Sequence, residues 1–273
     1  AGAAAAFAVA SVVAWRARAR WEVTVWDVLA LAAIAWAMGR AAPATTPWPA
    51  FLDSTWYVNT GARIADTGRL AFDTPAWPAD AAARRAVTTT FADMRAAGVP
   101  GMPDDASRGF FDVAFVVPDL ASPTVVPYHP PFFASFVALV VRARGASRAG
   151  EAVLAWALAY LLAVAALARA AFGPRAGALA ALLVGASPAL VYYGRVPFAE
   201  MCAGALATAG LVALVHLPDE RPAPWLAAAA GAALGLSVIA KADLLVVVPA
   251  ALVGWLWSRR RTGGAREAAG LAA

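Results

Sequence analysis

The sequence predicts an all-α polytopic membrane protein with about six to seven transmembrane helices and one large external loop that contains short helices. The first observation behind this class is composition. The 273 residues are 62% hydrophobic and 14% charged, whereas soluble domains carry about 45–50% apolar and about 25% charged residues. The second is a series of uncharged runs close to the ~20 residues that a helix needs to cross a bilayer. The third is a long stretch, 41–128, that contains no such run.

The N-terminal part, residues 1–40, holds the first transmembrane helix. Residues 1–15 are apolar but short, and they fit a cut helix, a signal-like segment or an interfacial segment equally well. Three arginines within 16–20 form a basic turn, which we expect on the cytoplasmic side. Residues 23–39 are the first secure spanning run, with a single charge, Asp27, near its start.

Residues 41–150 form the predicted external loop. The loop is rich in proline, aspartate and threonine, and it carries nine aspartates against six arginines up to residue 128. We predict a short helix over 54–68, with Asp53 as its N-cap. We also predict a strand or buried extended segment over 110–117.

The apolar run 132–141 decides the topology. At about 1.5 Å of rise per residue it is too short to span, so we expect an interfacial helix near 132–142. If this helix does not cross, the basic clusters near 16–20, 169–175 and 259–266 share one side of the membrane. The acidic loop then lies on the other side, as the positive-inside rule favours.

The rest of the chain consists of a predicted transmembrane helix bundle, 151–258, and a basic cytoplasmic tail, 259–273. The uncharged runs of the bundle are 152–168, 176–194, 201–217, 222–240 and 244–258. Their many small residues favour close packing of helices.

Composition and missing motifs exclude several classes of function. A single cysteine, Cys202, allows no disulfide within the chain. The sequence contains no Gly-rich phosphate loop, His-Glu-x-x-His zinc motif, Cys-x-x-Cys pair or Gly-x-Ser-x-Gly nucleophile elbow. The formal net charge is +5, but the basic clusters are short and expected on the cytoplasmic side, so we expect no nucleic-acid partner.

Ionisable residues at or within the apolar segments are the candidate functional residues, because charge is costly there. Asp53 suits a helix N-cap, and it also suits a general base that activates an acceptor hydroxyl or amine. His129 lies in Tyr-His-Pro-Pro, where the prolines hold an extended backbone. It suits a structural role, a phosphate contact or a metal ligand.

Two further pairs of charges interrupt the bundle. Arg195 and Glu200 suit an ion pair in a turn. Alternatively, the arginine binds a phosphate and the glutamate binds a divalent cation together with Asp53. Lys241 and Asp243 suit a tight external turn between two helices, and Lys241 also suits contact with an anionic lipid phosphate.

Four local features resemble the GT-C superfamily of integral-membrane glycosyltransferases, in particular bacterial relatives of protein O-mannosyltransferases and the lipid A aminoarabinose transferase. These features are Asp53-Ser-Thr-Trp-Tyr57 followed by Ala62-Arg63 and Gly68; Tyr128-His-Pro-Pro-Phe-Phe133; Tyr192-Tyr-Gly-Arg195 with Glu200 five residues on; and Gly235-Leu-Ser-Val-Ile-Ala-Lys241. The likeness runs from about residue 22 to residue 258. The sequence departs from the family at Ser54, where many relatives have a second acid of the metal-binding arrangement.

The resemblance implies transfer of a hexose or pentose from a polyprenyl-phosphate-linked donor to a protein, lipid or glycan acceptor. It places the active site on the external face of a bacterial plasma membrane. Asp53 is the implied catalytic base, and Asp53 and Glu200 are the candidate ligands of a divalent cation, magnesium or manganese. The implied substrate-binding residues are Tyr57, His129, Arg195 and Lys241. Typical members are longer, so we expect this chain to be the front part of a larger protein or one subunit of an assembly.

A non-enzymatic polytopic membrane protein, either a transporter or an assembly scaffold, is the alternative. Transporters place charges near the midplane of the membrane and often contain internal repeats. In this sequence the charges gather at one predicted face and no clear repeat is visible, which favours chemistry at the membrane surface.

Overall fold

The computed structural model describes residues 22–42, 53–73, 80–111, 115–122, 124–217, 224–254 and 256. The predicted segments 1–15, 16–20 and 259–273 lie outside the described residues. The described chain is mostly helical, in agreement with the predicted class.

The chain divides into two compact units. The helical unit comprises Ala1–Pro43, Leu154–Gly194 and Ala199–Ala273. The loop unit comprises Ala44–Val153 and Arg195–Phe198.

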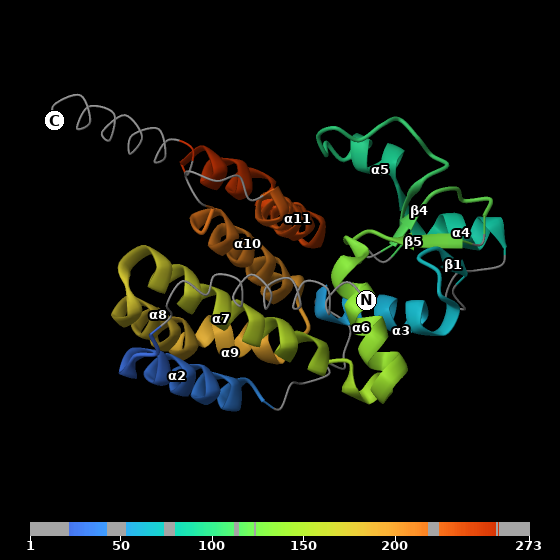
Figure 1. Cartoon of the computed structure of the whole chain (residues 1–273). Helices are drawn as coiled ribbons and strands as arrows, with labels where there is room; N and C mark the ends of the chain where they lie inside the picture. Colours follow the sequence, from blue (N-terminus) through green and yellow to red (C-terminus); the bar gives the residue numbers. More distant parts are fainter. Residues whose placement is uncertain are drawn as a thin grey trace, which may run out of the picture. The chain divides into compact units, whose positions relative to one another are not determined.

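The helical unit is built of apolar helices (Figure 1). Its labelled helices are α2 (Val25–Ala41), α7 (Glu151–Phe172, which starts in the loop unit), α8 (Pro174–Ala186), α9 (Pro188–Arg195), α10 (Ala199–Val215) and α11 (Pro224–Ala240). Another apolar helix covers Leu244–Gly254.

Glycines bring the helices of this unit close together. A Cβ atom added to Gly185 of α8 would lie 2.8 Å from the Cβ of Ala37 in α2. A Cβ atom added to Gly210 of α10 would lie 2.6 Å from the Cγ of Leu234 in α11. Neither space admits a side chain, so these glycines permit the close contacts of α2 with α8 and of α10 with α11.

Asp27, the one charge in the first predicted span, has structural partners at the start of α2. Its carboxylate accepts hydrogen bonds from the backbone N–H and the hydroxyl of Thr24, both at 2.8 Å. It also forms an ion pair with Arg169 near the end of α7. Both side chains of this ion pair are partly buried, and the pair ties α2 to α7.

The described helices support fewer membrane spans than the sequence predicts. One helix, Ala146–Phe172, is long and apolar enough to cross a membrane alone. Pro174–Ala186 and Pro188–Arg195 pass that test only together, with a 66° bend between them. Pro188 causes the bend, since it favours extended backbone at the preceding residue, and Ser187 has a ψ of 131°. Helices α10 and α11 are apolar but have only 17 residues each. The described part therefore contains one or two clear spans, and the count of six to seven is not confirmed.

The loop unit contains short helices, as predicted, and a small antiparallel sheet (Figure 1). Its elements are α3 (Asp53–Thr67), β1 (Phe72–Asp73), α4 (Ala81–Val87), β2 (Thr88–Thr90), α5 (Phe91–Ala96), β3 (Gly109–Phe111), β4 (Phe115–Val117), β5 (Thr124–Pro127), α6 (Pro131–Arg144) and the 3₁₀ helix η1 (Ala146–Arg148). Helix α3 matches the helix predicted over 54–68, and α6 matches the one predicted near 132–142.

The sheet has the strand order β1-β5-β4-β3-β2. The segment 110–117, predicted as one extended element, instead contributes to two antiparallel strands, in which Phe110 pairs with Val116. Val117 of β4 and Val125 of β5 are fully buried and form a small hydrophobic core. The prediction of extended structure is confirmed, and the prediction of a single segment is wrong, because the chain folds back to bury its apolar residues.

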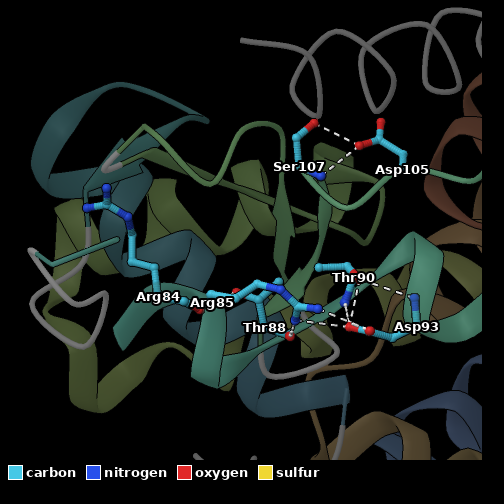
Figure 2. A network of polar contacts seen from close by, with 7 residues as sticks. All are labelled: Arg84, Arg85, Thr88, Thr90, Asp93, Asp105 and Ser107. Carbon is cyan, nitrogen blue, oxygen red and sulfur yellow. Dashed lines mark hydrogen bonds and ion pairs between the residues drawn. The ribbon is translucent and has the colours of Figure 1, made fainter. Parts of the chain in front are cut away.

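A polar network fixes the connection from α4 through β2 to α5 (Figure 2). The hydroxyl and the backbone N–H of Thr90 donate to the Asp93 carboxylate at 2.6 and 3.0 Å. The Arg85 guanidinium binds both oxygens of the same carboxylate at 3.1 Å. The hydrogen bond from the Thr90 hydroxyl, followed by that from Arg85, lowers the pKa of Asp93 to about 2.

Buried Arg84 fastens α4 to the loop that follows β4. Its guanidinium donates to the carbonyl oxygens of Leu120 and Ala121 at 2.7 and 3.2 Å. The hydroxyl of Thr88 in turn donates to the Arg84 carbonyl at 2.8 Å. Hydrogen bonds to backbone carbonyls satisfy this charge, so Arg84 has a structural role.

Candidate functional site

Helices α3 and α6 pack closely in the loop unit. A Cβ atom added to Gly61 of α3 would lie 2.6 Å from the Cγ1 of Val137 and 3.0 Å from the carbonyl oxygen of Ala134. Gly61 therefore sets the distance between these helices. The contact buries Val58 of α3 and Phe133 of α6, and it positions the aromatic residues at the start of both helices.

His129 lies among aromatic rings just before α6. Its imidazole stacks on Trp56, with ring centroids 4.9 Å apart and planes inclined by 22°. Tyr57 and Tyr128 approach the same imidazole with centroid distances of 5.5 Å. Pro131 then begins α6, a position that suits proline because its φ is already helical and no N–H is needed. The imidazole is thus in contact with three aromatic rings, two from α3 and one from the residue before His129.

Tyr57 is a buried packing residue. It is 6% exposed, and its ring meets Phe133 edge-on with centroids 5.3 Å apart. The sequence suggests Tyr57 as a substrate contact. Its packing on His129 and Phe133 also suits a supporting role.

Asp53 is the first residue of α3. Positions 53, 56 and 57 follow the i, i+3, i+4 spacing that places residues on one face of a helix. Asp53 therefore begins one turn before the two aromatic residues that hold His129. The side chain of Asp53 lies outside the described part of the structure, so its role as a base stays a prediction.

Glu200 and Lys241 form an ion pair between the start of α10 and the end of α11. The Lys241 Nζ lies 2.9 Å from the Glu200 Oε1 and 3.4 Å from the Asp243 Oδ2. Burial lowers the pKa of Lys241, but the hydrogen bond from Lys241 to Glu200 and the charges of Glu200 and Asp243 outweigh it, so the pKa is raised above its ordinary value. Lys241 therefore carries a charge at neutral pH.

The turn predicted at Lys241 and Asp243 is confirmed. Helix α11 ends at Ala240, and the next helix begins at Leu244, whose N–H donates to the Lys241 carbonyl at 3.1 Å. Arg195 is the exposed last residue of α9, and the described ion pair of Glu200 is with Lys241.

The surroundings of Glu200 do not suit a divalent cation. A lysine ammonium already contacts one carboxylate oxygen, and a cation there would be repelled by it. Among the described residues, no group of three or more His, Cys, Asp or Glu side chains could hold a metal ion. The metal assignment to Asp53 and Glu200 stays a prediction, and the pairing of Glu200 argues against its part in it.

Sequence reasoning missed two of these contacts. The sequence does not single out Trp56, although its position one turn after Asp53 points to the site. Glu200 and Lys241 were given separate roles. Consecutive apolar helices usually pack antiparallel, so the start of one lies beside the end of the next. Glu200 at the start of one predicted helix and Lys241 at the end of the next could have been paired on this ground.

Comparison with known proteins adds one match. The model of the family described as dolichyl-phosphate-mannose-protein mannosyltransferase matches residues 128–269. The match begins at Tyr128, next to His129, and it includes Arg195, Glu200 and Lys241. No curated protein and no solved structure shows a significant match to the chain.

Proposed function

Because the chain belongs to the dolichyl-phosphate-mannose-protein mannosyltransferase family, whose model covers more than half of it, we propose that it transfers mannose from a polyprenyl-phosphate donor to an acceptor hydroxyl outside the membrane. Family membership favours an enzyme over the transporter or scaffold considered from the sequence. It also favours a hexose over a pentose as the transferred sugar, and a protein over a lipid or a glycan as the acceptor.

Asp53 is the proposed general base. Its carboxylate takes the proton of the acceptor hydroxyl while the hydroxyl oxygen forms a bond to the anomeric carbon of the sugar. The bond between that carbon and the phosphate oxygen breaks, and polyprenyl phosphate leaves with the electron pair. General bases contribute about 10²–10⁴-fold to such reactions.

The observation that carries this proposal is the arrangement at His129. The imidazole is held by Trp56 and Tyr57, which follow Asp53 by one helical turn. The family match begins at the neighbouring residue, Tyr128. Helix α3 therefore carries both the predicted base, Asp53, and the two aromatic residues that contact the predicted phosphate ligand, His129.

Cationic or hydrogen-bond-donating side chains are the proposed contacts of the donor phosphate. Negative charge grows on that phosphate as the sugar leaves, so fixed positive charge or hydrogen-bond donors stabilise the transition state. His129 and Arg195, which both belong to the loop unit, are the proposed contacts. The substrate-binding role that the sequence predicts for Lys241 is not part of this proposal. In this proposal Tyr57 supports His129 and does not bind the sugar, and no step depends on a metal ion.

The test is transfer of radiolabelled mannose from polyprenyl-phosphate mannose to membrane proteins, with the full chain in proteoliposomes. Asp53→Asn should lower the rate by about 10²–10⁴-fold. Asp66→Asn is the matched control, because Asp66 is an exposed aspartate of the same helix, and it should leave the rate unchanged. Near-normal transfer by Asp53→Asn, with normal protein yield, would end the assignment of the base.

A further inference from the structure

Three arginines lie close together where α6 ends and α7 begins. Arg142 and Arg144 are in the last turn of α6, and Arg148 is in η1. All three are exposed. We call Arg142, Arg144 and Arg148 the arginine cluster. The proposed reaction assigns no role to them.

Local structure holds the cluster in place. Gly145 ends α6 with a φ of +88°, a conformation that favours glycine, and the chain turns there into η1. The first residue of α7, Glu151, then joins two of the arginines: its carboxylate lies 2.5 Å from Arg144 Nη1 and 2.8 Å from Arg148 Nη1. Glu151 is the only described carboxylate in an ion pair with the cluster, so positive charge remains in excess.

The neighbouring helix fixes the depth of the cluster in a membrane. Ala146–Phe172 is the described helix that is long and apolar enough to cross on its own. After Glu151 it carries no charge until Arg169. Because charged groups avoid the hydrocarbon core, the start of this helix must lie at the level of the lipid headgroups. Leu139, which is 51% exposed, precedes Arg142 by one turn and adds an apolar contact at the same boundary.

We propose that the arginine cluster is a binding surface for the headgroups of anionic phospholipids. Guanidinium groups match phosphate oxygens in pairs of hydrogen bonds. The side chains of Arg144 and Arg148 are 58% and 59% exposed, so each side chain stays largely accessible despite its ion pair with Glu151. A lipid held here anchors the junction of α6 and α7. The proposal is independent of the catalytic assignment to Asp53.

The test measures which lipids stay bound to the purified full chain. The protein is reconstituted in nanodiscs that contain equal amounts of phosphatidylcholine and phosphatidylglycerol, and bound lipids are counted by native mass spectrometry. The wild-type chain should retain phosphatidylglycerol preferentially. Arg142→Gln/Arg144→Gln should lower the ratio of bound phosphatidylglycerol to phosphatidylcholine by about fivefold or more. This variant leaves Arg148 to pair with Glu151.

Two further variants test whether the change in lipid ratio is specific to the arginine cluster. Arg69→Gln/Arg95→Gln removes the same charge from exposed positions elsewhere in the loop unit and should leave the ratio unchanged. Glu151→Gln removes the neutralising carboxylate and should raise the ratio. Equal ratios in the wild type and in Arg142→Gln/Arg144→Gln would overturn the proposal, as would an equal fall in the control.

A final arm separates the two sources of phosphate. Polyprenyl phosphate is added to nanodiscs of phosphatidylcholine alone, and its retention is compared between the wild type and Arg142→Gln/Arg144→Gln. Similar retention by both proteins supports a phospholipid surface. Loss of polyprenyl phosphate while phosphatidylglycerol binding stays normal would assign the cluster to the donor and contradict the proposal.

Discussion

At the scale of single residues, Glu200 and Lys241 stabilise the ends of two packed apolar helices. Their side chains are 27% and 31% exposed, so water weakens the interaction without removing it. Pairs of this kind contribute up to about 1 kcal/mol. The pairing also keeps Lys241 charged at neutral pH.

A double-mutant cycle measures this pair. Glu200→Gln and Lys241→Gln should each lower the unfolding temperature in detergent, and together they should lower it less than the sum of both. The expected coupling energy is about 0.5–1 kcal/mol. Asp243→Asn is the control, because Asp243 is 81% exposed and 3.4 Å from the lysine, and it should change stability less. Additive effects of the two glutamine variants would show that the pair contributes nothing.

Asp93 predicts how the stability of the loop unit depends on pH. Its pKa is lowered to about 2 in the folded chain, against about 3.9 in an unfolded one. The folded state therefore gains stability from Asp93 above about pH 4, and this gain is lost as the pH falls towards 2. Asp93→Asn should flatten the fall in unfolding temperature over that window. Asp104→Asn, at an exposed loop position, should leave the slope as in the wild type, and an unchanged slope in Asp93→Asn would contradict the assignment.

At the scale of elements, the contact of α3 with α6 positions the rings around His129. The helices approach at Gly61, where an added Cβ would meet Val137 at 2.6 Å and backbone at 3.0 Å. Both helices were predictable from the sequence, because their apolar spacing, the predicted helix start at Asp53 and the prolines before α6 are local signals. Their contact was not predictable, because no local signal specifies which glycine meets which valine.

Gly61→Ala should force the two helices apart. Overpacking of this kind costs about 1–3 kcal/mol, so the unfolding temperature should fall and mannose transfer should weaken. Adding Val137→Ala removes Val137 Cγ1, the nearest atom that the new methyl group meets, and should restore part of both. Gly39→Ala serves as the control, since nothing lies within 4 Å of a Cβ at that helical position. A stable, active Gly61→Ala protein would mean that the helix contact does not set the site.

The elements that the sequence misjudged have a common cause. A run of apolar residues indicates burial but not the path of the backbone. Residues 110–117 therefore read as one strand, whereas β3 and β4 pair with each other. The run 176–194 reads as one spanning run, and its two helices pass the spanning test only together, with a 66° bend between them at Pro188. In both cases the path of the backbone within the run, and not its apolar pattern, decides the structure.

At the scale of the whole molecule, the proposed reaction requires a defined orientation of the chain in the membrane. By the positive-inside rule, we expect the acidic loop outside and the arginine-rich ends in the cytoplasm. The composition was enough to predict an apolar, mostly helical chain. The number of spans was not, because alanine-rich helices of 17 residues lie between the lengths typical of buried and of spanning helices.

Cysteine labelling tests this orientation. The chain has one cysteine, Cys202, which is buried, so Cys202→Ser gives a cysteine-free background. Asp66→Cys should react with a membrane-impermeant maleimide added to intact cells. Thr262→Cys, in the predicted cytoplasmic tail, should react only after the cells are opened. The reverse pattern would place the loop in the cytoplasm and exclude an external active site.

The central claim is that Asp53 acts as a base beside a polyprenyl-phosphate donor held by His129. The measurement that tests it most directly is an experimental structure of the full chain with a polyprenyl-phosphate sugar analogue bound. The account predicts that the phosphate contacts His129 and that the Asp53 carboxylate faces the anomeric carbon within reach of an acceptor hydroxyl, roughly 3–4 Å away. An analogue bound elsewhere, or an Asp53 carboxylate turned away from the sugar, would contradict it.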